Sequence, residues 1–213
     1  MNETARARVI LADDHQMVAE GLRGLLEPHF DLVSIVNNGH DLLAAVDKYK
    51  PDAVVADISM PLLNGIDAAA RISDKHPDIS IVLLTMYPDA SYVRRAFDAG
   101  VSAYVLKHSA PSELVTAINE ALKGHVFVTP GVAGEDLSQH RDSDGPDLSE
   151  LTQRQREVIQ LLAEGRSAKE VASILDISAR TVEFHKYRIM RLLGIQNTAE
   201  LVQFAIRHGL ISD

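Results

Sequence analysis

Residues 53–65 read AVVADISMPLLNG, an apolar run that ends in an aspartate and continues into a loop. The first half of the chain repeats this kind of run five times, as RVILA (8–12), DLVSIV (31–36), AVVAD (53–57), ISIVLLT (79–85) and SAYVLK (102–107). Runs that are apolar at nearly every position are typical of strands buried on both faces, as in a parallel sheet covered by helices. The pattern therefore predicts an α/β fold with a doubly wound parallel sheet of the (βα)5 type.

Stretches with helical spacing separate these runs, and we expect helices at 16–26, 42–48, 65–73, 90–97 and 112–122. Pro111 near the start of the last helix and Gly124 just after it are typical boundary residues. These boundaries predict that the first domain spans residues 1–124.

The pattern changes at residues 125–147, which are rich in Gly, Pro, Ser and Asp and contain few large apolar residues. Such a composition predicts a flexible linker. From residue 148 to 213 we expect a small all-α domain of four helices. Its expected boundary residues are the capping boxes Thr152/Gln155 and Ser167/Glu170, the N-cap candidates Ser178 and Thr198, and the helix stops Gly165, Gly194 and Gly209.

The net charge of −9 is unevenly distributed along the 213 residues. Residues 1–124 contain 11 Lys/Arg and 17 Asp/Glu (net −6), residues 125–147 have a net charge of −4, and residues 148–213 have +1. DNA binding by the last segment would depend on a local cluster of cations. The chain has no cysteine, which excludes disulfides and thiolate sites, and it has neither a long apolar stretch nor a signal-peptide core. We expect a soluble, cytoplasmic protein without a membrane partner.

Polar side chains follow the predicted strands at their carboxyl ends. Asp13 and Asp14 follow the first strand, Asp57 ends the third, Thr85 ends the fourth and Lys107 ends the fifth. The carboxyl ends of parallel strands form one edge, where α/β proteins bind ligands. Three clustered carboxylates favour a divalent cation with oxygen ligands, most naturally Mg²⁺. One carboxylate can then attack a phosphoryl group whose oxygens Lys107 and Thr85 bind.

The segments LADDH, VVADISMPLLNG, LLTMY and SAYVLK resemble the receiver domain of two-component response regulators over residues 8–124. This resemblance implies that Asp57 accepts the phosphoryl group. It also implies a metal site made by Asp14 directly, Asp13 through water, Asp57 and the Ser59 carbonyl, and a phosphate-binding and switch set made by Thr85, Tyr104 and Lys107.

Two positions depart from this pattern or have an alternative interpretation. Many receivers have a cis proline after the lysine, whereas this chain has His108, and a cis bond without proline costs about 3 to 4 kcal/mol. The geometry of that peptide bond is left open. A half-buried strand aromatic is the simpler interpretation of Tyr104.

Residues 150–211 resemble the LuxR-type helix-turn-helix domain throughout. A helix at 168–175, a turn at 176–178 and a second helix at 179–193 leave the second helix exposed for the DNA major groove. Val182, Ile189 and Leu193 form its apolar stripe, whereas Glu183, Phe184, Tyr187 and Arg191 lie on another face. The resemblance places Glu183, Phe184 and Tyr187 at base edges. The full set of expected DNA contacts is Lys169, Arg180, Thr181, Glu183, Phe184, Lys186, Tyr187 and Arg188, of which Lys169, Arg180, Lys186 and Arg188 suit phosphates.

Together the two segments resemble NarL/FixJ-type response regulators. This resemblance implies phosphorylation by a sensor histidine kinase, binding to paired promoter half-sites as a phosphorylated homodimer, and RNA polymerase as a further candidate partner. The only expected catalysis is Mg²⁺-dependent self-phosphorylation from a donor and self-dephosphorylation at Asp57. A phosphatase with an aspartyl-phosphate intermediate would need a substrate cap and a second acid or base, and neither is visible. The last helix, at 198–207, serves either dimerisation or closure of the core.

Overall fold

The computed structural model describes residues 6–86, 90–109, 111–133 and 148–211. The chain forms two compact units, the first containing the elements β1 to α6 and the second the elements η1 to α10. No helix in these described ranges combines the length and the apolar character of a membrane span.

The first unit is built on one parallel sheet with the strand order β2-β1-β3-β4-β5-β6. Its strands are β1 (Arg8–Ala12), β2 (Asp31–Val36), β3 (Ala53–Asp57), β4 (Ser80–Thr85), β5 (Ala103–Leu106) and β6 (Phe127–Val128). The order reverses between β1 and β3, so the connections after these two strands leave the sheet in opposite directions. This reversal opens a crevice at the carboxyl ends of β1 and β3.

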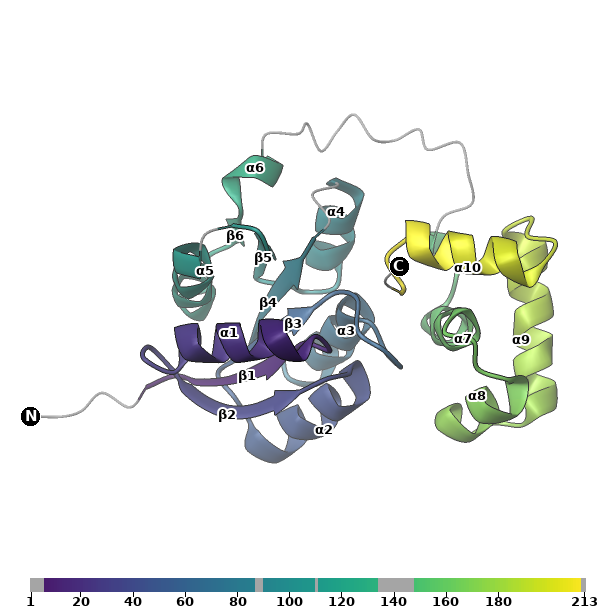
Figure 1. Cartoon of the computed structure of the whole chain (residues 1–213), viewed down its shortest axis with the longest axis horizontal. Helices are drawn as coiled ribbons and strands as arrows, with labels where there is room; N and C mark the ends of the chain where they lie inside the picture. The colour runs from purple at the N-terminus through teal and green to yellow at the C-terminus, as the bar shows by residue number, and fades with distance from the viewer. Residues whose placement is uncertain (1–5, 87–89, 110, 134–147, 212–213) are drawn as a thin grey trace, which may run out of the picture. The chain divides into compact units, whose positions relative to one another are not determined.

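Helices cover both faces of the sheet, as predicted (Figure 1). They are α1 (Gln16–Leu26), α2 (Gly39–Tyr49), α3 (Gly65–Lys75), α4 (Ala90–Asp98), α5 (Pro111–Leu122) and the short α6 (Pro130–Ala133). Helices α1 and α5 share one core with alternate residues of β1, β3, β4 and β5. Helices α2 and α3 lie side by side on the opposite face, with α4 next to α3 (Figure 1).

The sheet has six strands rather than the five predicted. Strand β6 pairs in parallel with β5, so that Phe127 lies opposite Ala103 and Val128 opposite Tyr104. The Phe127 N–H donates to Ser102, and residues 127 and 128 add apolar side chains to the edge of the sheet. The prediction of a linker from residue 125 is therefore wrong for the stretch that contains β6 and α6. The remaining linker residues, 134–147, lie outside the described residues.

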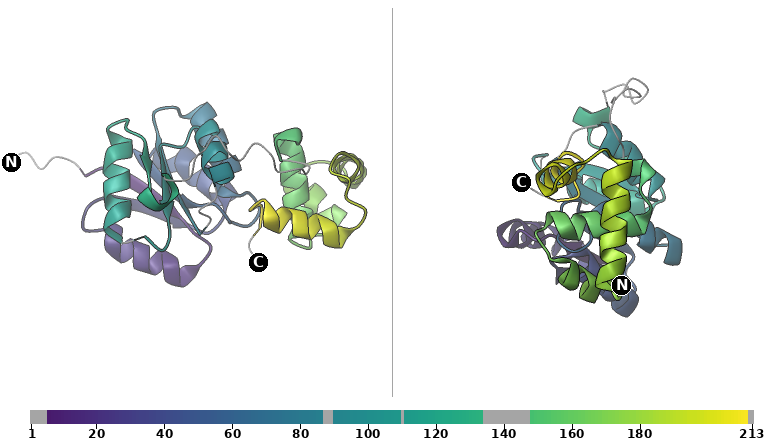
Figure 2. Two further views of the ribbon diagram at one scale, coloured as in Figure 1. Left: turned by 90° about the horizontal axis from the view of Figure 1, so that it is seen from above. Right: turned by 90° about the vertical axis from the view of Figure 1, so that its right-hand side faces the viewer.

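The second unit is helical, as predicted. It comprises the 3₁₀ turn η1 (Leu148–Glu150) and the helices α7 (Gln153–Ala163), α8 (Ala168–Leu175), α9 (Ala179–Leu192) and α10 (Thr198–Arg207). Helix α9 lies across α7 and α8, and the right-hand view of Figure 2 shows it along its length in light green. Its predicted apolar stripe, Val182, Ile189 and Leu193, is buried in the core of this unit.

Local capping explains where these helices begin. Both predicted capping boxes are confirmed, and the Ser178 hydroxyl accepts from the Thr181 N–H at the start of α9. The N-cap of α10 is Asn197 rather than Thr198, because the Asn197 amide oxygen accepts the Glu200 N–H. An amide in this position satisfies a free N–H of the first turn as well as a hydroxyl does.

Candidate functional site

The acidic side chains predicted at the carboxyl ends of the strands come together in the first unit. Asp13 and Asp14 follow β1 and Asp57 ends β3, on either side of the reversal in strand order. One potential ligand atom each from Asp13, Asp14, His15 and Asp57 lies within 4.8 Å of the others. Asp13 and Asp57 are only 2% and 4% exposed, whereas Asp14 reaches solvent. The cluster is therefore a partly buried group of carboxylates with an open side.

Lys107 joins two of these carboxylates. Its Nζ lies 2.7 Å from Asp57 Oδ2 and 2.8 Å from Asp13 Oδ2, and its side chain is 12% exposed. Burial lowers the pKa of Lys107, but the adjacent Asp57 and Asp13 outweigh burial and raise it. The ammonium group is therefore firmly charged and fixed beside Asp57.

Asp57 has an unusual electrostatic environment. Burial raises the pKa of its carboxyl group, and this effect exceeds the opposing effects of Lys107 and the Ser59 N–H. Asp13 adds to the increase in the pKa of Asp57 through like-charge repulsion. Negative charge on Asp57 is thus incompletely balanced by the side chains around it, and a further positive group would stabilise it.

The loop after β3 holds Asp57 in place through close backbone packing. The Gly65 N–H donates to the Ile58 carbonyl at 2.8 Å, and a Cβ at Gly65 would lie 2.1 Å from the Asp57 carbonyl oxygen. Only glycine allows this approach, which brings the start of α3 against the end of β3. Asn64 caps α3 by accepting the Asp67 N–H. Ser59 is buried in the same loop, and its hydroxyl has no hydrogen-bond partner among the described residues.

Thr85 and Tyr104 lie on the same face of the sheet. Leu83 pairs with Tyr104 in adjacent strands, and Thr85 is two residues beyond Leu83, so their side chains project to the same side. Both residues are 0% exposed, so Tyr104 is fully buried rather than half-buried. The Lys107–His108 peptide, whose geometry the sequence left open, is trans.

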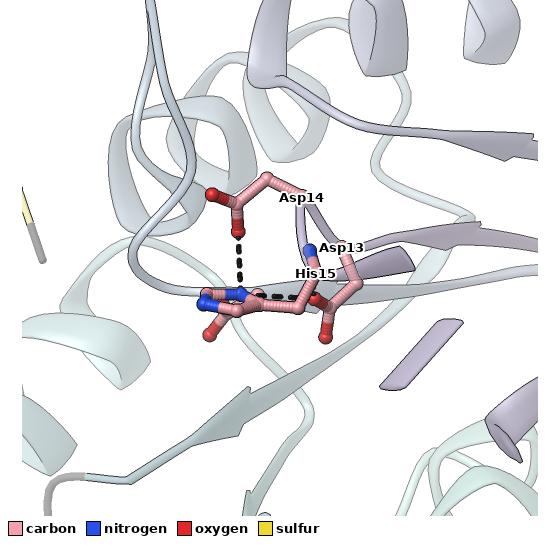
Figure 3. A group of neighbouring side chains, drawn as sticks. Asp13, Asp14 and His15 are labelled. Atoms are coloured by element: carbon pink, nitrogen blue, oxygen red, sulfur yellow. Dashed lines mark hydrogen bonds and ion pairs between the residues drawn. The ribbon is translucent and has the colours of Figure 1, made fainter. Parts of the chain in front are cut away.

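His15 belongs to the acidic cluster, although the sequence did not indicate it. Its Nδ1 lies 2.9 Å from Asp14 Oδ1 and 3.5 Å from Asp13 Oδ1 (Figure 3). The sequence did place His15 directly after two candidate metal ligands. The side chains of consecutive residues often point in different directions, however, so this position alone does not predict that His15 joins the cluster.

The candidate DNA-binding residues lie on α8 and α9 of the second unit. Glu183, Phe184 and Tyr187 are exposed, and the two aromatic residues are 55% and 65% exposed. The Arg188 guanidinium lies over the Phe184 ring, 5.6 Å from its centroid. The predicted face of α9 therefore exposes aromatic rings beside cationic groups.

The cations predicted for phosphate contact are accessible. Lys169, Arg180 and Arg188 are exposed and Lys186 is half-buried, and none of them forms an ion pair within the described ranges. Thr181 differs, because it is half-buried and its hydroxyl bonds to the Ser178 hydroxyl at 2.8 Å.

His185 is half-buried on α9. Burial lowers the pKa of its imidazole, and the nearby Arg154 and Arg188 add to this effect. His185 is therefore a partly packed residue of α9.

Comparisons with known proteins agree with both halves of this description. The family model of the response regulator receiver domain matches residues 9–119, and that of the bacterial regulatory proteins of the luxR family matches residues 149–205. The transcriptional regulatory protein MctR of Rhizobium johnstonii is 33% identical, covering 100% of this chain and 99% of its own length. The oxygen regulatory protein NreC of Staphylococcus aureus is also 33% identical, covering 96% of this chain and 99% of its own.

A solved structure of the response regulator RcsB of Salmonella typhimurium has a TM-score of 0.65 and 27% identity, covering 96% of this chain and 99% of that one. The family matches cover a sheet with an acidic edge and a helical unit with an exposed second helix. The chain therefore belongs to the NarL/FixJ-type two-component response regulators, in which a receiver domain precedes a LuxR-type DNA-binding domain.

Proposed function

We propose that a sensor histidine kinase phosphorylates Asp57 in an Mg²⁺-dependent reaction, and that this modification controls binding of the second unit to promoter DNA. The observation that carries the proposal is the position of Lys107, whose ammonium group bridges Asp57 and Asp13 at 2.7 and 2.8 Å. A buried carboxylate with one fixed cation beside it and an open side is suited to take up a phosphoryl group.

The donor set of the cluster fits Mg²⁺. Asp13, Asp14 and Asp57 provide carboxylate oxygens, which hard cations prefer. The buried Ser59 hydroxyl, which has no hydrogen-bond partner among the described residues, adds a polar group in the same loop. We propose Asp14 and Asp57 as direct ligands, Asp13 as an indirect ligand and the Ser59 carbonyl as a fourth group. When bound, Mg²⁺ would neutralise charge on the transferred phosphoryl oxygens.

The side chains of the chain itself account for the transfer. An oxygen of Asp57 attacks phosphorus, the bond from phosphorus to the nitrogen of the donor histidine breaks, and the histidine retains the electron pair of that bond. Lys107 moves from its carboxylate partners to a phosphoryl oxygen, and the Thr85 hydroxyl donates to another. Tyr104 shares a sheet face with Thr85, so movement of Thr85 toward the phosphoryl group changes the packing around the ring. Small phosphodonors would serve in the same way, and water would later remove the phosphoryl group.

In the second unit, we propose that α9 enters the major groove. Lys169, Arg180, Lys186 and Arg188 would contact phosphates, while Glu183, Phe184 and Tyr187 would face base edges. Thr181 stays a candidate through its position at the start of α9. A solved structure of an RcsB–DNA complex, 28% identical with a TM-score of 0.58 over 93% of this chain and 97% of that one, supports this proposal.

Phosphorylation would act on DNA binding through dimerisation or through contacts between domains. Another solved structure contains RcsB dimers bound to DNA, which supports a homodimer on paired half-sites. We place the domain boundaries at the end of α6 and at residue 148, with 134–147 as the linker. Because promoter DNA is the proposed target, we expect the protein to act in the cytoplasm, where RNA polymerase is a further candidate partner.

Labelling by acetyl phosphate tests the chemistry. The wild-type protein should take up one phosphoryl group in Mg²⁺ and none in EDTA, and Asp57→Asn should take up none because an amide is not a competent nucleophile. Asp14→Ala should lose Mg²⁺ binding and labelling together. Asp74→Asn, which changes an exposed carboxylate on α3, is the matched control and should label normally. If Asp57→Asn is labelled to the same extent as the wild-type protein, a residue other than Asp57 accepts the phosphoryl group.

A further inference from the structure

His15 occupies the N-cap position of α1, but its side chain makes no capping hydrogen bond. The preferred N-cap residues are Ser, Thr, Asp and Asn, because their side-chain oxygens accept a free N–H of the first turn. Histidine provides no comparable short acceptor. Helix capping therefore gives no reason for an imidazole at this position.

The imidazole instead turns toward the carboxylates. Figure 3 shows its Nδ1 between Asp14 and Asp13, at 2.9 and 3.5 Å from one oxygen of each. The backbone N–H of His15 donates to the same Oδ1 of Asp13 at 2.9 Å, which fixes the start of the side chain beside the cluster. Lys107 approaches the other oxygen of Asp13, Oδ2. The imidazole and the ammonium group therefore contact different oxygens of Asp13.

These distances are close to those of a coordination sphere. Two ligands on opposite sides of one cation, each at about 2.1 Å, are about 4.2 Å apart. The potential ligand atoms of Asp13, Asp14, His15 and Asp57 all lie within 4.8 Å of one another. Small side-chain rotations would bring Asp14, His15 and Asp57 to one cation with Asp13 close enough to act through water, and the His15 side chain, 55% exposed, has room for such a rotation.

We propose that His15 Nδ1 is a ligand of the receiver cation site, which makes this site bind borderline divalent cations such as Co²⁺ and Zn²⁺ more tightly than an all-oxygen site would. The proposal rests on the proposed function, because it assumes that the acidic cluster holds a divalent cation. Carboxylates and carbonyls suit Mg²⁺, whereas imidazole suits Zn²⁺ and its neighbours in the transition series. The imidazole nitrogen should therefore affect Co²⁺ and Zn²⁺ strongly and Mg²⁺ weakly.

A positioning role predicts different behaviour. If His15 only donated a hydrogen bond to Asp14, it would orient that carboxylate for every cation, and its loss would weaken Mg²⁺ and Co²⁺ equally. An asparagine can place an N–H donor near the position of Nδ1 but offers no imidazole lone pair. His15→Asn therefore separates ligation from positioning.

The experiment measures binding of Mg²⁺ alone and Co²⁺ alone to the full-length protein at one fixed pH, together with the visible spectrum of bound Co²⁺. The proteins are wild type, His15→Ala, His15→Asn and the control His29→Ala, which removes an exposed imidazole beyond the opposite end of α1. We expect both His15 variants to lose Co²⁺ affinity by at least about tenfold and to change its spectrum, with Mg²⁺ affinity within about threefold of wild type. His29→Ala should match wild type.

Four results would overturn the proposal. Restoration of Co²⁺ binding by His15→Asn, or a parallel loss of both cations in His15→Ala, would make His15 a positioning residue. Unchanged Co²⁺ affinity and spectrum in both variants would exclude ligation. A wild-type protein that binds neither cation would overturn the proposed function as well, whereas wild-type Mg²⁺ binding with no effect of His15 would leave the proposed function intact.

Discussion

The acidic site and the surface of α9 differ in how firmly the structure holds their charged groups. In the receiver, Asp57 is 4% exposed and paired with Lys107, and its pKa is raised by burial. On α9, Arg180 and Arg188 are exposed and form no ion pair within the described part of the chain. Burial of charge is costly and calls for a specific partner or a chemical role, whereas an exposed cation needs no explanation. The receiver site is thus preorganised, and the DNA surface would acquire its order on binding.

The largest expected effect links the two regions. Phosphorylation of Asp57 should raise DNA affinity by about 100-fold or more, mainly through dimerisation. The second domain has a net charge of only +1, so a single copy should bind weakly, and tethering two copies makes the second contact intramolecular. Sedimentation and DNA titration of the full chain, with and without phosphodonor, measure both quantities, and Asp57→Asn is the control. A phosphorylated protein that stays monomeric on and off DNA while its affinity rises would instead support release of an inhibited second domain.

The close backbone packing around Asp57 can be tested by a substitution at Gly65. Gly65→Ala should lower the free energy of unfolding by about 1 to 3 kcal/mol, because the new Cβ would lie 2.1 Å from the Asp57 carbonyl oxygen, which cannot move easily. Gly21→Ala is the matched control, since Gly21 lies inside α1 and a Cβ there would meet nothing within 4 Å beyond the adjacent backbone of its own helix. It should be stabilising by about 0.5 to 1 kcal/mol. Equal effects in urea denaturation would show that the close approach at Gly65 can relax.

The raised pKa of Asp57 predicts how its charge affects stability. The folded protein binds the Asp57 proton more tightly than the unfolded chain does, so charging this group costs stability as the pH rises through the folded-state pKa. In EDTA at neutral pH, Asp57→Asn should therefore be more stable than wild type, and the difference should shrink as the pH falls through that pKa. The midpoints of urea denaturation of the two proteins, measured over this pH range, give the difference in stability. Mg²⁺ should stabilise wild type selectively, since it binds only the folded site. If Asp57→Asn is less stable than wild type in EDTA, the attraction between Lys107 and the Asp57 carboxylate outweighs the cost of burying the negative charge.

Much of the receiver could be predicted from the sequence because its strands are buried on both faces. Such strands appear as continuous apolar runs, and parallel pairing puts their carboxyl ends at one edge, so Asp13, Asp57 and Lys107 could be assigned to the same edge. The contacts of Lys107 with Asp13 and Asp57 depend on the strand order and on a long side chain that reaches across β4. Strand β6 escaped prediction because two residues at a sheet edge are too short for a periodic signal. The full burial of Tyr104 depends on tertiary packing that a strand pattern does not contain.

The position of His15 and the DNA surface were harder to predict for different reasons. His15 is the N-cap residue of α1, and the direction of its side chain depends on the backbone angles at that position. The amino-acid sequence alone does not determine these angles. On α9 the exposed and buried faces follow from the helical period, so the accessibility of Phe184 and Tyr187 was predictable. Which exposed residue contacts a base depends on the geometry of the complex.

The half-buried cation Lys186 on α9 can be tested by its salt dependence. Lys186→Ala should weaken binding to every DNA sequence and reduce the slope of log K against log salt by about one, because a single phosphate contact releases about one counterion. Lys123→Ala, which removes an exposed lysine paired with Glu120 in the first unit, should leave the slope unchanged. An unchanged slope for Lys186→Ala would remove that lysine from the interface.

The smallest effect concerns a cation–π contact on α9. Arg188 lies 5.6 Å from the centroid of the Phe184 ring, and such an exposed cation–π pair contributes about 0.5 to 1 kcal/mol. If the ring holds Arg188 ready for DNA, Phe184→Leu should weaken binding by about two- to fivefold. Part of this loss should vanish in an Arg188→Ala background, which a double-mutant cycle isolates from any contact that Phe184 itself makes with DNA. Tyr187→Leu, which changes the neighbouring exposed ring, should combine additively with Arg188→Ala. If the losses of DNA affinity in Phe184→Leu and Arg188→Ala are additive as well, the Phe184 ring does not order Arg188 for DNA binding.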